Sequence, residues 1–435
     1  AGRDIEMIST EYVSHLERLV EEGKVDERLI DDAAGRILAL KFKLGLFDDP
    51  FRYINLEREK AAQLKPEYRA LAREAAQKST VLLKNDGVLP FSKEIRSVAV
   101  IGPYADNGRI LGEWSGVGRP EEAVTLAQGI RNKLGDRARI YAAAGCDCLS
   151  DDVSGFQEAL EAAAAAEAVI LALGEEGHMS GEAASRAFLD LPGAQRRLAE
   201  EVLRLGKPTA LVLFNGRPLE LRWYHENVPA ILEAWFPGTE GGSAIADLLF
   251  GDAVPSAKLT MSFPYTVGQV PVYYNCLNTG RPKGPDENNN FRYLSKYIDI
   301  PNAPLYPFGY GLSYTQFAYS EAGLDGAELV PGGTVKARVV VTNTGNFTGE
   351  EIVQMYIRDL WGSAARPVLE LKGFRKVRLA PGESAAVEFE IRPEMLAYFT
   401  PRKKMETEPG DFKVFVGSNA RDLLECGVFA YSENE

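Results

Sequence analysis

The chain has 435 residues, of which 45% are hydrophobic and 26% charged, so it is long enough for about two to four globular domains. Its formal net charge of −13 excludes general binding to phosphate backbones, so nucleic acid is not an expected partner, and four cysteines are too few for a disulfide scaffold. No apolar run reaches the roughly 18 residues of a membrane-spanning helix, so no membrane is expected as a partner.

Two amphipathic helices are predicted near the start of the chain. Apolar residues at helical spacing over residues 11–22 predict the first helix, and Asp26 is the expected cap of a second helix that ends near Gly45. Two helices of this size cannot bury a core by themselves, so residues 1–50 are expected to pack on a larger body. Residues 51–74 are interpreted as a linker.

Residues 75–265 alternate between apolar strands and helices. Strands are predicted at residues 80–83, 98–101, 168–173, 209–214 and 228–235, and helices at residues 156–166, 194–205 and 243–250. This alternation is typical of a parallel sheet with helices on both faces, whose ligands bind beyond the carboxyl ends of the strands.

The remaining residues divide into a connecting segment and an all-β part. Residues 266–319 are rich in Pro, Gly, Asn and Tyr and show little periodicity, so they are interpreted as a segment that connects two domains along the surface. Short strands follow, including residues 336–342, 352–357 and 386–391, and turn signals separate them. Their spacing predicts a β-sandwich over residues 320–432.

No cofactor and no metal ion are expected from the motifs of the chain. It has no glycine-rich phosphate loop, and its three histidines give little material for a catalytic triad or a metal centre. Cys146 and Cys148 have no second cysteine pair or histidine cluster beside them, so they are interpreted as two thiols rather than metal ligands.

The segment 174–186 is the first candidate site, because it directly follows a predicted buried strand. It carries the carboxylates Glu175, Glu176 and Glu182 together with Arg186 on a loop that contains glycines. Loops held by a rigid scaffold often carry function, although a loop that is merely polar is the alternative explanation.

Trp114 is the second candidate, because it lies among glycines in the segment 112–118. Such neighbours offer an indole ring little cover, so the ring can be exposed for stacking on a ligand. The alternative is that the Trp114 side chain folds back onto the core.

The following segments of the sequence form an ordered set of motifs: residues 1–7, 30–38, 41–47, 79–90, 215–219, 234–238, 251–252 and 307–315. Through them the chain resembles glycoside hydrolase family 3, the family of β-glucosidases and β-xylosidases, over essentially its whole length. The resemblance implies the end of a (β/α)₈ barrel in residues 1–50, an α/β sandwich with a mainly parallel sheet in residues 75–265, and a fibronectin type III-like β-sandwich in residues 320–432.

The activity that the resemblance implies is retaining, exo-acting hydrolysis of a terminal non-reducing β-D-glucosyl residue. In such enzymes one carboxylate attacks the anomeric carbon, and a second protonates the leaving oxygen and then activates water. The resemblance places the nucleophilic Asp before Ala1, and Asp4 comes too late in the motif to be this residue. The nucleophile is therefore expected outside this chain, in an N-terminal part or in a companion chain or fragment that carries the rest of the barrel.

The resemblance also implies roles for individual residues of the two candidate segments. Glu182 matches the general acid/base, and Glu175 is the fallback, with Glu176 a further alternative. This acid must stay protonated near neutral pH, either through burial or through the charge of the nucleophile. Trp114 resembles an aromatic residue that lines the leaving-group side of the pocket. Arg186 is expected either to bind sugar hydroxyls or to hold the acid/base loop in place.

Three readings of the function remain at this point. A β-glucosidase acting on β-linked gluco-oligosaccharides or aryl glucosides is favoured, with β-xylosidase or another β-glycosidase of the family as its variant. A non-catalytic carbohydrate-binding scaffold has less need of the Glu182 loop, and a non-glycosidase α/β protein fits fewer of the motifs. A homo-oligomer is compatible with the sequence, and a periplasmic, secreted or cytoplasmic location stays open.

Overall fold

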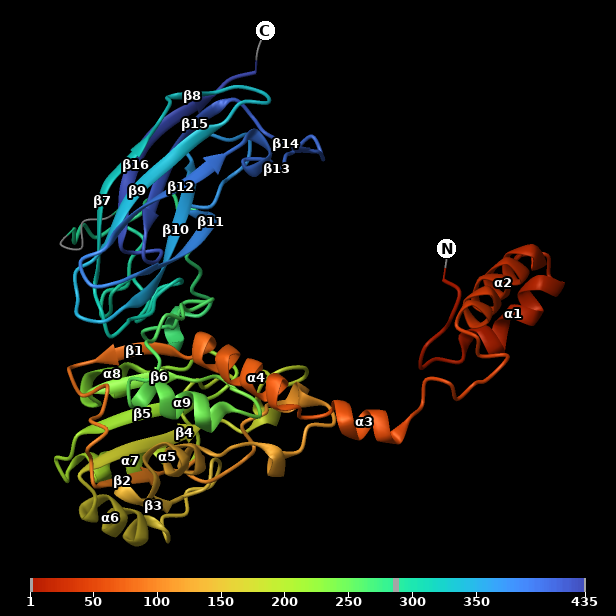
Figure 1. The fold of residues 1–435 in the computed structure, drawn as a ribbon. Helices are drawn as coiled ribbons and strands as arrows, with labels where there is room; N and C mark the ends of the chain where they lie inside the picture. Colours follow the sequence, from red (N-terminus) through yellow and green to blue (C-terminus); the bar gives the residue numbers. More distant parts are fainter. Residues whose placement is uncertain (1–2, 285–288, 434–435) are drawn as a thin grey trace. The chain divides into compact units, whose positions relative to one another are not determined.

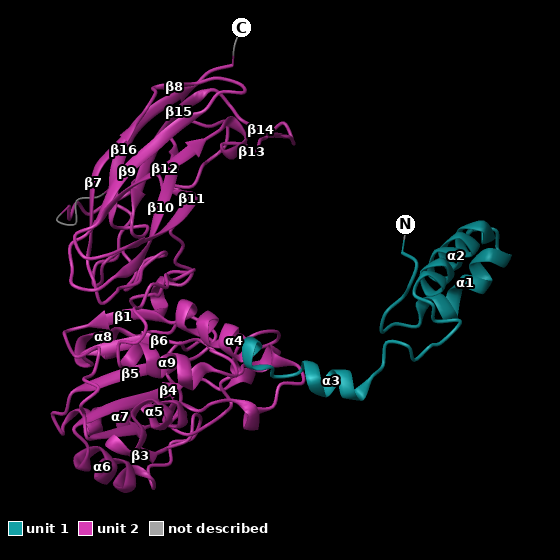
Figure 2. Ribbon diagram, in the orientation of Figure 1, with its two compact units in different colours: residues 1–68 teal, residues 69–435 magenta. Residues whose placement is uncertain are grey.

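The computed structural model of the chain describes residues 3–284 and 289–433 (Figure 1). Residues 1–2 of the first motif and residues 285–288 of the connecting segment lie outside the described residues. The chain forms two compact units, Ala1–Tyr68 and Arg69–Glu435 (Figure 2). Over the described residues, no helix has both the length and the apolar content needed to cross a bilayer.

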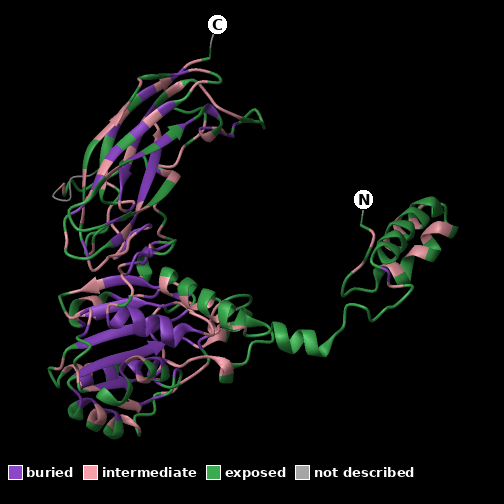
Figure 3. Cartoon of the chain, viewed as in Figure 1, coloured by how far each residue is buried: buried purple, intermediate pink, exposed green. Residues whose placement is uncertain are grey.

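The first unit contains three helices and the start of a fourth: α1 (Glu11–Glu21), α2 (Glu27–Lys43), α3 (Leu56–Ala62) and the first residues of α4 (Pro66–Ser79). The carboxylate of Asp26 accepts a hydrogen bond from Arg28 N at 3.0 Å and so caps α2 as predicted. Neither α1 nor α2 contains a buried residue, and Val13 (87% exposed) and Phe42 (67% exposed) leave the apolar faces of these helices uncovered (Figure 3).

The second unit begins with a six-stranded sheet in the order β1-β6-β5-β4-β2-β3. Its strands are β1 (Val81–Asn85), β2 (Ser97–Ile101), β3 (Arg139–Ala143), β4 (Ala168–Gly174), β5 (Thr209–Phe214) and β6 (Ala230–Glu233). All neighbouring strands are parallel except β1, which pairs with β6 in the antiparallel direction.

Helices cover both faces of this sheet, which explains why its central strands are apolar without interruption. These helices are α4, α5 (Leu126–Leu134), α6 (Phe156–Ala165), α7 (Gln195–Leu203), α8 (Arg222–Asn227) and α9 (Gly241–Leu249). Along β4, Val169 and Leu171 belong to the core that includes α6 and α7, whereas Ile170 and Ala172 belong to the core that includes α5 and α9. Successive side chains of a strand alternate between its faces, so both cores are filled from one strand.

Two further sheets form the sandwich that follows, in the orders β11-β10-β15-β16-β8 and β12-β9-β7. The strands are β7 (Phe317–Leu324), β8 (Glu328–Leu329), β9 (Val335–Asn343), β10 (Gly349–Asp359), β11 (Glu370–Leu379), β12 (Ser384–Ile391), β15 (Gly410–Gly417) and β16 (Leu423–Tyr431), and β13 (Tyr398–Phe399) pairs with β14 (Met405–Glu406). Alternate residues of β9, such as Ala337 and Val339, lie in the core between the sheets. The predicted order of a mainly parallel α/β part followed by a β-sandwich is confirmed.

Short 3₁₀ helices occur in the connecting loops: η1 (Glu113–Ser115), η2 (Pro120–Glu122), η3 (Gly135–Arg137), η4 (Gly177–Met179), η5 (Val267–Gln269) and η6 (Pro393–Met395). Two of them, η1 and η4, lie in the candidate segments that the sequence singled out. Both follow parallel strands, β2 and β4, and so lie at the edge of the sheet where ligands are expected.

Candidate active site

Loops beyond the carboxyl ends of β2, β4 and β6 meet at one edge of the sheet, because these strands are parallel. Glycines permit their close approach. A Cβ atom added at Gly177 would lie 3.0 Å from Glu113 N, and one added at Gly112 would lie 3.1 Å from the Phe236 side chain. The loop after β4 therefore packs directly on the loop after β2, which in turn packs on the loop after β6.

Glu175 is the first residue after β4, and its side chain is completely buried. Its carboxylate forms ion pairs with Arg186 and with Arg217, whose Nε lies 3.1 Å from Glu175 Oε1. The backbone of Glu175 donates to Phe214 O at 2.8 Å and accepts from Tyr104 Oη at 2.6 Å. A buried carboxylate is costly unless it is paired, so the two arginines explain its presence here. In this chain Glu175 is thus enclosed by protein groups.

Glu182 lies in the turn after η4 and is exposed. Within the part of the chain that the structure describes, its carboxylate has no hydrogen-bond or ion-pair partner. Its neighbours Gly181 (φ +108°) and Ala183 (φ +58°) both have positive φ angles. The turn therefore presents the Glu182 side chain to solvent on a backbone of unusual conformation.

Trp114 lies in η1 and is 73% exposed, so its ring is not folded onto the core. The indole borders the Glu182 turn, since a Cβ atom added at Gly181 would lie 2.5 Å from Trp114 Nε1. The structure thus brings Trp114 and Glu182, which are distant in sequence, to the same place.

Arg186 binds two protein groups in the described structure. Besides its ion pair with Glu175, its Nη2 donates to the carbonyl oxygen of Asp190 at 3.0 Å. These contacts favour the second of its two expected roles, which is to hold the loop. The sequence analysis did not single out Arg217, the other partner of Glu175; its only signal was a place in the motif 215–219.

A second buried carboxyl group, that of Glu233, lies at the carboxyl end of β6. Burial raises the pKa of Glu233 well above its usual value, although the Trp235 N–H donates to Glu233 Oε1 at 3.1 Å. Among the described residues, Glu233 Oε2 and Asn215 Oδ1 are buried oxygens without a hydrogen-bond donor. A proton on Glu233 supplies the missing donor, so we interpret this residue as a neutral carboxylic acid.

A cavity of about 390 Å³ lies beside these residues, between the loops after β2 and β4. One wall includes Glu176 and His178, whose Oε2 and Nδ1 atoms are 3.3 Å apart. The opposite wall includes Glu113, the neighbour of Trp114. The cavity therefore adjoins both predicted site segments and is lined by groups that can form hydrogen bonds.

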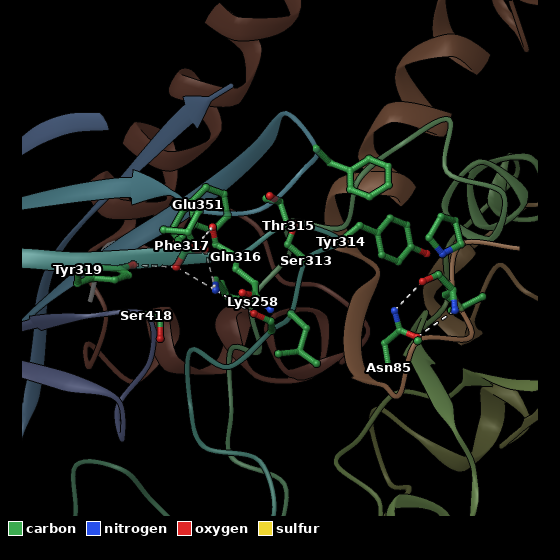
Figure 4. Close-up of a pocket in the computed structure, with 17 residues that line it drawn as sticks. Asn85, Lys258, Ser313, Tyr314, Thr315, Gln316, Phe317, Tyr319, Glu351 and Ser418 are labelled. Atoms are coloured by element: carbon green, nitrogen blue, oxygen red, sulfur yellow. Dashed lines mark hydrogen bonds and ion pairs between the residues drawn. The ribbon is translucent and has the colours of Figure 1, made fainter. Parts of the chain in front are cut away.

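A larger cavity, of about 640 Å³, lies elsewhere in the second unit (Figure 4). It contains a buried polar group of three residues: Lys258 Nζ lies 3.2 Å from Glu351 Oε2, and Tyr319 Oη donates to Glu351 Oε1 at 2.8 Å. None of the predicted site residues lines this cavity. The charged groups of Lys258 and Glu351 are already paired with each other, so this cavity is a weaker candidate site than the edge of the sheet.

The described residues contain no group of three or more His, Cys, Asp or Glu side chains that could hold a metal ion. Cys146 and Cys148 are free and buried. Burial raises the pKa of each thiol to about 12, so both are protonated at neutral pH.

Comparison with known proteins agrees with this arrangement. The family model of the glycosyl hydrolase family 3 C-terminal domain matches residues 80–314, and that of the fibronectin type III-like domain matches residues 351–420. The chain belongs to glycoside hydrolase family 3. The resemblance stated from the sequence is therefore confirmed.

Relatives of this family 3 chain are named as glycosidases. It is 42% identical to a periplasmic beta-glucosidase of Salmonella typhimurium, covering 96% of this chain and 57% of that protein. It is 39% identical to a beta-xylosidase of Formosa agariphila, covering 97% of this chain and 57% of that protein. The structure of a mutant beta-glucosidase from Listeria innocua in complex with laminaribiose superposes with a TM-score of 0.90 at 41% identity, covering 99% of this chain and 59% of that one. The chain thus spans less than two thirds of the length of these relatives.

Proposed function

We propose that this chain supplies the acid/base half of a retaining, exo-acting β-glucosidase. The observation that carries the proposal is the free carboxylate of Glu182, which a loop presents at the ligand-binding edge of the sheet. Trp114 borders the same turn and offers an exposed ring for a sugar. The substrate would be a β-linked gluco-oligosaccharide or an aryl glucoside, cleaved at its terminal non-reducing glucosyl residue.

In the proposed reaction Glu182 acts twice. As an acid it gives a proton to the glycosidic oxygen while an aspartate attacks the anomeric carbon, and as a base it takes a proton from the water that releases the glucosyl residue. In the complete site the negative charge of the nucleophile would favour the protonated acid, and this effect would be lost once the covalent intermediate forms.

The nucleophile would come from a (β/α)₈ barrel that the first unit completes. The uncovered apolar faces of α1 and α2 support this proposal, because neither helix has a buried residue and Val13 and Phe42 are largely exposed in the described part of the unit. The remaining barrel strands would belong to an N-terminal part, a companion chain or a fragment. In this division residues 1–50 belong to the barrel, and 51–74 form a linker that contains α3 and ends within α4. Residues 75–265 carry the acid/base loop, 266–319 connect and 320–432 form the sandwich.

The test of Glu182 uses the enzyme complete with its barrel. The Glu182→Ala variant should lose about 10²–10⁴-fold in kcat/KM on cellobiose, which has a poor leaving group, and far less on 2,4-dinitrophenyl glucoside, which needs little protonation. Glu176→Ala is the matched control, since it removes a carboxylate from the same loop. The proposal is wrong if Glu182→Ala behaves like the wild type, and the assignment moves to Glu176 if that variant shows the leaving-group pattern instead.

A β-xylosidase is the second candidate function, and the Formosa agariphila relative supports it. The two candidates differ in one hydroxymethyl group of the glycone. Comparing kcat/KM for aryl β-glucosides and aryl β-xylosides with the same leaving group decides between them.

A further inference from the structure

Arg217 binds the turn that carries Glu182 at two points, one before Glu182 in the sequence and one after it. Its Nη2 donates to the carbonyl oxygen of Ala184 at 2.8 Å, after Glu182, and to the carbonyl oxygen of Met179, before it. The same guanidinium pairs through Nε with Glu175. Arg217 itself comes from the loop after β5, so the Glu182 turn is held by a neighbouring strand.

The other end of this chain of contacts is the rigid sheet. Glu175 directly follows β4, is completely buried, and donates through its backbone to Phe214 O at the end of β5. The backbone of Arg217 is fixed in turn, because Asn215 Nδ2 donates to Arg217 O at 2.6 Å. The side chains of Glu175 and Arg217 thus connect the sheet to the turn and fix the position of the turn relative to the sheet.

The turn needs such support because its own backbone is unfavourable. Gly181 tolerates a positive φ, whereas Ala183 has a Cβ atom and rarely adopts one. The Glu182 side chain has no protein partner in the described structure, so it does not stabilise the turn. Only an arginine offers several N–H groups in a planar fork that can reach a carboxylate and two carbonyl oxygens at once.

We infer that Arg217 is the positioning residue of the general acid/base: it sets where the Glu182 carboxylate lies while its own donors bind protein groups rather than sugar. This inference rests on the proposed function of Glu182. Its consequence is that loss of Arg217 harms the steps that need proton transfer by Glu182 and spares the steps that do not. Arg186 binds Glu175 and Asp190 O, outside the turn, so it does not replace Arg217.

The first experiment measures leaving-group dependence in the complete enzyme. Arg217→Met should lower kcat/KM about 10–100-fold on cellobiose and less than about 3-fold on 2,4-dinitrophenyl glucoside, with azide restoring kcat on the latter. Arg217→Lys keeps a charge beside Glu175 but cannot bind both carbonyl oxygens, so it should fall between the wild type and Arg217→Met even if the Met variant folds poorly. Arg204→Met is the matched control, because Arg204 is exposed and its ion-pair partner in the described structure is Glu201; it should behave like the wild type.

The second experiment separates this inference from the proposed function. In a Glu182→Ala background, Arg217→Met should cost less than about 2-fold more on cellobiose, since the group that it positions is already gone. Hydrogen exchange of residues 179–184 should also rise in Arg217→Met and not in Arg204→Met, whatever the role of Glu182 is.

Each outcome of these experiments decides one part of the inference. Equal losses on both substrates, or full additivity with Glu182→Ala, overturn the positioning role, and unchanged exchange of residues 179–184 overturns the structural basis for it. If Glu182→Ala itself behaves like the wild type while the exchange of the turn still rises, the proposed function has failed and the contact between Arg217 and the turn stands.

Discussion

At the scale of single residues, three glutamates show how position decides the use of a carboxyl group. Glu175 is buried and paired with two arginines, Glu233 is buried without a cation, and Glu182 is exposed without any partner in the described structure. The first arrangement favours a fixed charge, the second a neutral acid, and the third a group that is free to react. All three residues are glutamates near strand ends, so the sequence alone does not distinguish their environments.

Glu233 leads to a prediction about pH. Because the pKa of Glu233 is raised in the folded protein, the neutral form of Glu233 contributes fully to stability below about pH 4.5. This contribution is lost as the pH rises toward the folded-state pKa. Glu233→Gln mimics the neutral acid, so between pH 4.5 and 8 the wild type should lose stability relative to the variant, by at most about 1.4 kcal/mol per pH unit. Thermal melts across this range check it, with Glu226→Gln, which removes an exposed carboxylate, as the control. Parallel stability curves for the wild type and Glu233→Gln would contradict the neutral form.

Trp114 leads to a prediction about substrate binding. If its ring forms the wall of the leaving-group subsite, Trp114→Ala should lower kcat/KM for cellobiose more than kcat/KM for an aryl glucoside, whose smaller leaving group makes less contact with the ring. The difference should correspond to about 1–2 kcal/mol of transition-state binding. The exposure of the ring means that the melting temperature should change little. Both substrates and a thermal melt are measured side by side. Equal losses on both substrates with a large fall in melting temperature would remove the subsite role.

At the scale of elements, the apolar central strands and the capped helix α2 could be predicted, whereas the edge strand β3 and the capped helices α3 and α5 were not. β4 and β5 were recognised because they are apolar throughout, and α2 because Asp26 marks its start. β3 was missed because it lies at the sheet edge, where Arg139 and its neighbours are only partly buried. The direction of β1 was also beyond the sequence, since an apolar run does not say whether its neighbour is parallel.

The same limit applied to the candidate site. Glu182 and Trp114 lie in polar, glycine-bearing loops that follow predicted strands, and the family resemblance gave each its expected role. Arg217 could not be named, because its importance lies in contacts with carbonyl oxygens of residues 179 and 184, which any residue type provides.

The joining of α4 to the sheet domain leads to a prediction about stability. Asp247 in α9 is buried (4% exposed) and binds Arg73 and Gln77 of α4, with Arg73 Nε and Gln77 Nε2 each 2.6 Å from Asp247 Oδ2, as well as Lys133 of α5. Asp247→Asn would leave Arg73 without its ion-pair partner and Lys133 paired with Asp252 alone. It should lower the free energy of unfolding by about 3 kcal/mol. This is the lower end of the range for breaking a buried ion pair, because the Arg73 side chain is partly exposed to solvent.

Denaturant unfolding of the chain measures this change. Glu74→Gln is the control on the same helix, since it breaks an exposed pair with Lys78 and should change the free energy of unfolding by less than about 0.5 kcal/mol. A similar small effect for Asp247→Asn would show that the buried cluster does not hold α4 in place.

At the scale of the whole molecule, the chain carries the proposed acid/base loop on an α/β domain that a β-sandwich follows, together with a small unit whose helices leave apolar faces uncovered. Such a division is expected if the two carboxylates of a retaining glycosidase lie on different domains. The reaction then requires both domains. The central claim is that Glu182 is the acid/base and that another part of the enzyme supplies the nucleophile.

The most direct test of this claim is the product that the Glu182→Ala variant of the complete enzyme forms from 2,4-dinitrophenyl β-glucoside in the presence of azide. Without the base, water reacts slowly with the glucosyl-enzyme, whereas azide needs no deprotonation and attacks the anomeric carbon as the aspartate leaves. The account predicts β-glucosyl azide, with retained configuration, identified by NMR. Formation of the α-azide, or of no azide adduct alongside wild-type hydrolysis, would contradict it.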